Sequence, residues 1–116
     1  MVILITNNGL GSVQDPEGKA DVEFSQKMMG LFLRTLGALP DPPEKIIFYT
    51  EGVKLVADDS PVVAELGELE RRGMQIISCG TCLGYFGLTD RVAVGEIGGM
   101  GDILRAILEA DKVVTV

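Results

Sequence analysis

The sequence predicts an α/β protein in which a five-stranded parallel sheet lies between two layers of helices. Short runs of β-branched and aliphatic residues alternate with segments of helical period along the 116-residue chain. These runs are mostly continuous rather than alternating, which is typical of strands covered on both faces. The resulting order, β-α-β-α-β-α-β-α-β with right-handed crossovers, gives a parallel sheet between two helical layers.

Five runs are expected to form the strands. They are Val2 to Thr6, Lys45 to Thr50, Met74 to Ser78, Arg91 to Val94 and Lys112 to Val116. No repeat, low-complexity tract or linker interrupts them, and 47% of the residues are hydrophobic. We therefore expect one domain, spanning residues 1–116.

Two helices are expected before the third strand. In the first, Gly37 marks the end of a segment whose apolar residues recur at steps of three and four. These residues are Phe24, Met28, Leu31, Phe32 and Leu36. The second helix is expected to begin at Ser60-Pro61, an N-cap residue followed by proline at the first helical position, and to end at Gly73.

Two more helices are expected after the third strand. A short one begins near Cys79 to Cys82 and ends around Gly87. The last runs from about Gly99 to Glu109, and its inward stripe is expected to consist of Ile103, Ile107 and Leu108.

The composition excludes several classes of function. The formal net charge of −7 disfavours nucleic acid and anionic membrane surfaces as partners. No apolar run approaches the length of a membrane span, and the first residues lack the features of a secretory signal. We therefore expect a cytoplasmic protein whose two cysteines stay reduced.

Ligands of such sheets bind beyond the carboxyl ends of the strands, so the residues that follow each strand are the candidates for a site. After the first strand, the backbone amides of Asn7, Asn8 and Gly9 could face an anion, although an ordinary strand exit is the commoner explanation. After the second strand, Lys54 could stabilise a neighbouring thiolate, or could be a solvated loop lysine.

The segment after the third strand, Ser78 to Gly84, is the most specific feature. It contains a C-x-x-C motif in which Gly80 and Thr81 separate Cys79 from Cys82. A thiol between a strand and a helix lies near unpaired N–H groups, which favour the reactive thiolate. Four interpretations remain open: nucleophilic sulfur chemistry, a dithiol redox pair, a metal site and inert packing.

Absent residues narrow these interpretations. The chain has no histidine and two cysteines, so a zinc site would need ligands from another subunit or from carboxylates. All five prolines precede the motif, so the cis-proline of thioredoxins has no candidate. Without histidine, hydrolase triads are excluded. With no tryptophan and two tyrosines a flavin is not expected, so we predict no cofactor.

The segment after the fourth predicted strand is rich in glycine and includes Gly99 and Met100. Glycine allows the backbone to approach another segment closely, and the cysteine loop of the same or a neighbouring subunit is a candidate. A flexible start of the last helix is the alternative.

The stretch Ile76 to Leu83, with its continuation to Glu96, resembles the DsrE/DsrF-like sulfur-relay proteins. It is most similar to the C-terminal domain of the YedF proteins, which are labelled sulfurtransferase-like and linked to selenium metabolism. Glu51 to Leu55 and Ala110 to Val114 fit the same pattern. The resemblance covers nearly the whole chain as one DsrE-like domain and implies a flavodoxin-like α/β/α architecture, commonly assembled into oligomers.

The resemblance also implies a site and a partner. A cysteine after the third strand would carry a persulfide and exchange it with a TusA-like protein; this role maps onto Cys79, with Cys82 as the second possibility. YedF proteins carry a TusA-like domain ahead of this one, so a donor of that kind would here be a separate chain. The family's asparagine before methionine is replaced by Gly99 before Met100. A non-catalytic assembly module with structural or metal-sharing thiols is the alternative function.

Overall fold

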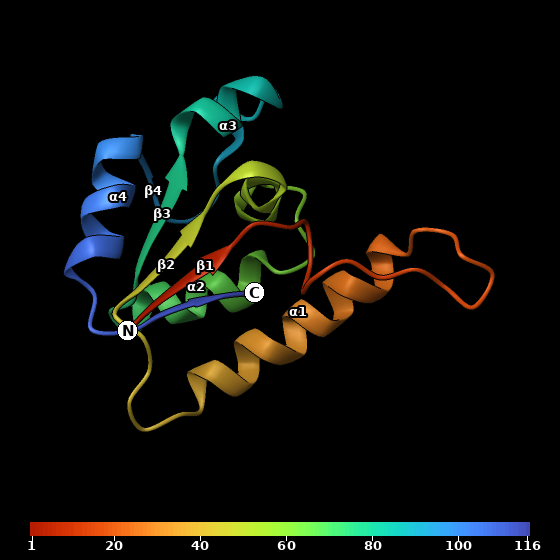
Figure 1. Cartoon of the computed structure of the whole chain (residues 1–116), viewed down its shortest axis with the longest axis horizontal. Coiled ribbons are helices and arrows are strands. Elements are labelled where there is room, and N and C mark those ends of the chain that lie inside the picture. Colours follow the sequence, from red (N-terminus) through yellow and green to blue (C-terminus); the bar gives the residue numbers. More distant parts are fainter.

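The computed structural model describes residues 1–116 and contains one five-stranded sheet in the order β4-β3-β2-β1-β5 (Figure 1). All of its strand pairs are parallel. The strands are β1 (Val2–Ile5), β2 (Lys45–Phe48), β3 (Gln75–Cys79), β4 (Glu96–Gly98) and β5 (Val113–Thr115). The predicted fold class is confirmed.

Helices cover both faces of this sheet (Figure 1). They are α1 (Val22–Gly37), α2 (Val63–Arg71), α3 (Gly80–Tyr85) and α4 (Met100–Glu109), with 3₁₀ helices η1 (Thr50–Val56) and η2 (Thr89–Arg91). The strands β1, β2, β3 and β4 follow one another across the sheet, so the chain moves in the same direction at each connection. Right-handed crossovers therefore place α1 and α2 on one face of the sheet, where they contact each other. The return from β4 to β5 places α4 on the opposite face, against β3 and β4. None of the helices is both long and apolar enough to cross a lipid bilayer.

The register brings the carboxyl ends of three strands together. Phe48 of β2 pairs with Ser78 of β3, and Cys79 of β3 pairs with Gly98 of β4. The fully buried side chains beneath this edge include Phe48 and Leu83. Whatever follows β2, β3 and β4 is therefore held at one edge by a packed core.

The fourth strand is predicted over residues 91–94, and this is wrong, because β4 is Glu96–Gly98. The predicted run instead pairs with η1 and the residues that follow it. The Ala93 N–H donates to the Val56 carbonyl at 2.8 Å, and the Asp58 N–H donates to the Arg91 carbonyl at 2.9 Å. Gly95, at φ +77°, then turns the chain toward β3.

The predicted inward stripes of two helices are also partly wrong. In α1, Phe24 and Leu31 are 48% and 51% exposed, and the core face is shifted to include Met29 and Leu33. In α4, the predicted Ile103 is buried, but Leu108 is 75% exposed. Apolar residues in these helices occupy more than one face, so the period alone did not identify the face that packs on the sheet.

The predicted starts of the second and last helices lie close to the observed ones. The second, α2, begins at Val63 rather than at proline. Ser60 caps the preceding turn instead, since its hydroxyl oxygen accepts from the Val62 N–H at 3.2 Å. Gly99 is the N-cap residue of α4, as the predicted boundary implies.

Candidate functional site

The two cysteines lie at the junction of β3 and α3. Cys79 ends the strand and is the N-cap residue of α3, and Cys82 lies in the first turn of that helix. Both thiols are free, but their accessibility differs. Cys79 is 2% exposed, whereas Cys82 is half-buried. A partner molecule can therefore approach Cys82 more readily than Cys79, although the resemblance favours Cys79 as the carrier.

Cys82 opens onto a largely apolar cavity of about 330 Å³. The cavity is lined by Thr50, Glu51, Thr81, Cys82, Tyr85 and Phe86. The Tyr85 and Phe86 rings meet edge to face, with their centroids 5.0 Å apart, and Tyr85 is 84% exposed. Such an exposed aromatic side chain beside a thiol suits contact with another protein.

Thr50, the residue that opens η1, is joined to the cysteine loop by its backbone. Its N–H donates a hydrogen bond to Cys82 Sγ at 3.1 Å. Thr50 is the one non-glycine residue with positive φ, at +51°, and its hydroxyl donates to the carbonyl of Thr6 at 2.8 Å. An N–H donor on sulfur favours the thiolate and the developing charge of a sulfur transfer.

Burial dominates the titration of Cys82. It raises the pKa of the Cys82 thiol, and a side-chain hydrogen bond with Cys79 raises that pKa further, while the Thr50 N–H lowers it. The N–H donor expected at the strand-to-helix junction is therefore present at Cys82, but burial opposes it. The physical reason is that desolvation of this partly buried sulfur outweighs the single N–H donor, and α3 is only six residues long.

The glycine-rich segment approaches the cysteine loop of its own chain, as one of the two interpretations of it predicts. A Cβ on Gly80 would lie 3.1 Å from Ile97 Cγ2 of β4, and Gly98 pairs with Cys79. Gly99 itself is tied to α4, since its N–H donates to Asp102 Oδ2 at 3.1 Å. Met100 is 58% exposed and lies outside the cavity at Cys82.

Lys54 is placed near the site but is not directed at a thiol. Its Nζ forms an ion pair with Glu51 Oε2 at 2.6 Å and lies 4.5 Å from the centre of the Phe86 ring. Lys54 and Asn8 line a second cavity of about 340 Å³ that shares Phe86 with the first. Lys54 therefore supports the ring beside Cys82.

The loop after β1 packs onto the start of α1. The Leu10 N–H donates to the Ser25 carbonyl at 2.9 Å, and the Asn8 side-chain oxygen accepts from Gln26 at 3.2 Å. Gly9 is buried, and a Cβ there would overlap the Ser25 side chain. Asn7 has one weak side-chain contact, its amide lying 3.5 Å from Thr6 Oγ1. These contacts favour an ordinary strand exit over an anion site.

Thr50, Tyr85 and Phe86 were missed as site residues from the sequence. Thr50 ends the run predicted as the second strand, and neighbouring parallel strands end at one edge, so the pairing of that strand with the third would have identified it. No signal in the sequence identifies Tyr85, because a tyrosine in a short helix is equally compatible with burial.

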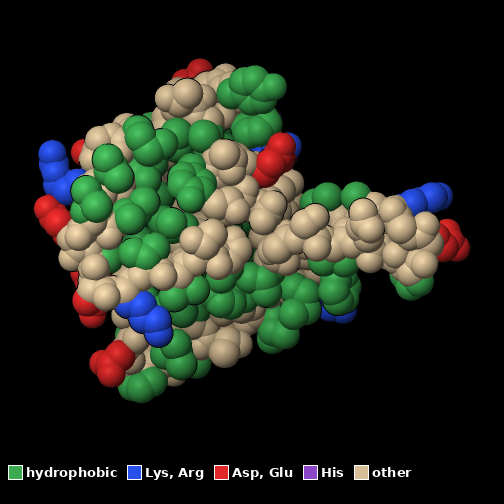
Figure 2. All heavy atoms as spheres, in the orientation of Figure 1, with side chains coloured by type: hydrophobic (Ala, Val, Ile, Leu, Met, Phe, Trp, Pro, Cys, Tyr) green, Lys and Arg blue, Asp and Glu red, His purple; other side chains and the backbone are tan.

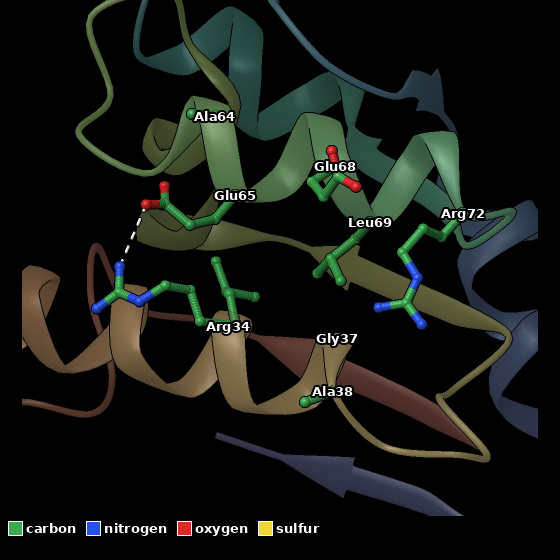
Figure 3. Close-up of a pocket in the computed structure, with 9 residues that line it drawn as sticks. Arg34, Gly37, Ala38, Ala64, Glu65, Glu68, Leu69 and Arg72 are labelled. Carbon is green, nitrogen blue, oxygen red and sulfur yellow. Dashed lines mark hydrogen bonds and ion pairs between the residues drawn. The ribbon is translucent and has the colours of Figure 1, made fainter.

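The largest cavity lies elsewhere, between α1 and α2 (Figure 3). It measures about 490 Å³, and the ion pair from Arg34 Nη1 to Glu65 Oε1, at 3.3 Å, joins the two helices at one end of it. None of the predicted site residues lines it. No group of three or more histidine, cysteine, aspartate or glutamate side chains is arranged to hold a metal ion.

Comparison with known proteins identifies one matching family and several solved structures with a similar fold. The DsrE/DsrF-like family matches residues 22–116. Among solved structures, the protein of unknown function MTH1491 from Methanobacterium thermoautotrophicum has a TM-score of 0.68 and 19% identity, covering 99% of this chain and 97% of its own. The ychN protein from E. coli has a TM-score of 0.64 and 18% identity with the same coverage. BT1422 from Bacteroides thetaiotaomicron, at 0.62 and 22%, covers 99% of this chain and 94% of its own. No curated protein matches the chain.

Proposed function

Since the chain belongs to the DsrE/DsrF-like family, which is broadly linked to sulfur relay, we propose that it carries a persulfide at the Cys79–Cys82 pair and exchanges it with a TusA-like protein. The observation that carries the proposal is the position of Cys82, on an open cavity with a backbone N–H donor on its sulfur. A relay of this kind needs an accessible thiol and no acid–base triad.

The chemistry of the exchange is a thiolate displacement. The Cys82 thiolate attacks the outer sulfur of the donor's persulfide, a new sulfur–sulfur bond forms on Cys82, and the donor's own thiolate leaves with the electron pair of the broken bond. The Thr50 N–H bonds to the sulfur that carries the charge before the attack. Because Cys79 is 2% exposed, we propose Cys82 as the sulfur that meets the partner.

The proposed partners occupy different faces. Tyr85, at 84% exposure beside Cys82, would contact the TusA-like donor. A homo-oligomer would use the outer face of α4, which presents Met100, Leu104 and Leu108 at steps of four; Figure 2 shows hydrophobic side chains gathered over this helix. The proposal places the protein in the reducing cytoplasm, where both thiols stay free. Kinship with YedF proteins, and with it a role in selenium metabolism, is part of the same proposal.

Loading with sulfur tests this function. The protein is incubated with a cysteine desulfurase, cysteine and a TusA-like carrier, and its intact mass is measured beside Cys79→Ser and Cys82→Ser. We expect a gain of about one sulfur atom in Cys79→Ser, where the accepted sulfur meets no second thiol, reversed by reductant, and no gain in Cys82→Ser. If Cys82→Ser gains sulfur and Cys79→Ser does not, the carrier residue is Cys79 instead. No gain in any variant would overturn the proposal.

The partner surface has a separate test. Tyr85→Ser should slow transfer from the TusA-like carrier by about tenfold or more, because exposed tyrosines often dominate such interfaces. Transfer from glutathione persulfide should stay unchanged. Leu39→Ser is the matched control, since Leu39 is 42% exposed and follows α1 at the opposite edge of the sheet. Equal effects of the two substitutions would remove Tyr85 from the interface.

A second function, a non-catalytic assembly module with structural or metal-sharing thiols, is favoured by two observations. Cys79 is buried, and burial raises the pKa of the Cys82 thiol. Alkylation of the native protein separates the two functions: a relay thiol at Cys82 reacts faster than the buried Cys79, and a structural pair reacts slowly at both positions. Metal analysis of anaerobically purified protein tests the shared-metal version, which a stoichiometry near zero excludes.

A further inference from the structure

We propose that the Cys79–Cys82 pair also reduces the sulfur it receives, releasing hydrosulfide and closing a Cys79–Cys82 disulfide. This inference rests on the proposed function, because it begins with a persulfide on Cys82. It adds an activity, persulfide reduction, that a carrier with a single thiol cannot perform without a second protein.

The two thiols are arranged for an internal reaction. Cys79 is the N-cap residue of α3, and Cys82 is the third residue of that helix. Residues at the N-cap and third positions face each other across the first turn of a helix, so their side chains are near neighbours. The Cys79 side chain is one cause of the raised pKa of the Cys82 thiol, and both sulfurs are free. A C-x-x-C pair of this kind can close a disulfide with little movement of strand or helix.

Burial assigns a different role to each sulfur. Cys79, at 2% exposure, is shielded from a protein-sized donor. Cys82 lines the cavity of about 330 Å³, which has room for one more sulfur atom. A donor therefore loads Cys82, and Cys79 has one accessible target, the inner sulfur of the loaded residue.

The reductive step is balanced within the protein. The Cys79 thiolate attacks Cys82 Sγ, the bond from Sγ to the outer sulfur breaks, and hydrosulfide leaves with its electron pair. The two cysteine sulfurs are oxidised to a disulfide, and the outer sulfur is reduced to sulfide. Hydrosulfide leaves readily because hydrogen sulfide is a stronger acid than an alkyl thiol. A second turnover needs a dithiol reductant to reopen the disulfide.

Thr50 favours this direction of attack. Its N–H donates to Cys82 Sγ at 3.1 Å, so it holds the inner sulfur while the outer one is free. The Thr50 N–H therefore holds Cys82 Sγ, the sulfur that is attacked, in place and leaves the outer sulfur free to depart.

A single-turnover experiment tests the inference. Fully reduced protein, freed of reductant, is mixed with one equivalent of glutathione persulfide, and sulfide is trapped with a bimane reagent while intact mass is followed. Wild type should release about one sulfide per chain and end about 2 Da lighter than the reduced protein. Cys79→Ser should keep the added sulfur and release at least tenfold less sulfide above the background measured with Cys82→Ser.

The outcomes distinguish a failure of persulfide reduction from a failure of the proposed sulfur-carrier function. If wild type keeps the added sulfur and releases no more sulfide than Cys79→Ser, persulfide reduction is overturned while the carrier function stands. If no variant gains sulfur and none releases sulfide, both fail. Cys79→Ala is measured in parallel, because a serine hydroxyl at a buried position can disturb folding, and it must reproduce the loss of sulfide release.

Discussion

The backbone N–H of Thr50 donates a hydrogen bond to Sγ of Cys82, at 3.1 Å. Thirty-two positions separate the two residues, and they meet because Phe48 of β2 pairs with Ser78 of β3. Thr50 makes this contact from a left-handed conformation, φ +51°, which a β-branched residue adopts only when its surroundings enforce it. The site therefore depends on the end of β2 as much as on the cysteine loop.

The hydroxyl of Thr50 is expected to hold this conformation, because it lies within hydrogen-bond distance of two carbonyl oxygens, Thr6 at 2.8 Å and Tyr49 at 2.7 Å. Thr50→Val keeps the branched side chain at positive φ and loses the hydroxyl, so it should lower the free energy of unfolding by about 1–3 kcal/mol. Thr50→Gly loses the same hydroxyl but adopts positive φ freely, so its loss should be smaller. Urea denaturation of both variants measures the difference, and equal losses would show that Thr50 is not strained.

The pKa of Cys82 predicts a pH profile for its reactivity. Burial and Cys79 raise this pKa, so iodoacetamide should alkylate Cys82 with a midpoint above that of a free cysteine. In Cys79→Ser, one of the raising causes is removed, and the midpoint should fall while staying above the ordinary value because burial remains. Peptide mass spectrometry across the pH range measures both midpoints. A midpoint unchanged by Cys79→Ser would contradict the contact between the thiols.

The same shift has a consequence for stability. A thiol whose pKa is raised by folding stabilises the native state below the ordinary thiol pKa, and this contribution is lost as pH rises through the raised value. The melting temperature of wild type should therefore fall more steeply at alkaline pH than that of Cys82→Ser. Parallel decreases would contradict the sign of the shift.

The sequence predicted the fold class and the cysteine segment because both depend on local pattern. Continuous apolar runs identified four of the strands, and C-x-x-C after the third run gave the candidate site, which stays a prediction. The fourth strand was misplaced because residues 91–94 carry the apolar pattern, whereas Glu96–Gly98 contains one apolar residue. A three-residue edge strand leaves little signal in sequence.

The contacts that shape the site depend on tertiary structure. Whether Cys79 or Cys82 is exposed follows from how α3 packs, since Leu83 of that helix is fully buried and turns Cys82 toward the cavity edge. The pairing of Lys54 with Glu51 depends on η1, which the sequence pattern did not predict. The resemblance supplied the family, and the structure supplied the unequal burial of the two thiols.

Gly52 is predicted to be intolerant of a side chain. It is buried in η1, and a Cβ there would overlap the carbonyl oxygen of Ile5 at the end of β1. Gly52→Ala should therefore lower the free energy of unfolding by about 1–3 kcal/mol. Gly84→Ala is the matched control: nothing lies within 4 Å of its Cβ position, and it is helical, so this substitution should stabilise by about 0.5–1 kcal/mol. Thermal melts measure both variants. Melting temperatures that shift in the same direction would contradict the close approach of Gly52 to the Ile5 carbonyl.

The outer face of α4 is predicted to carry the proposed homo-oligomer. Leu104 is 51% exposed at the centre of the Met100–Leu108 stripe, so Leu104→Glu places a charge on that face without removing a core side chain. Light scattering coupled to gel filtration should show wild type as an oligomer and Leu104→Glu as a monomer with a nearly unchanged melting temperature. Leu31→Glu on α1 is the matched control, because Leu31 is also 51% exposed but lies on the opposite face of the sheet. A carboxylate buried in an interface without a partner is costly, so the substitution that breaks the oligomer identifies the helix in the interface. If the oligomer persists in Leu104→Glu and is lost in Leu31→Glu, the interface lies on α1 instead.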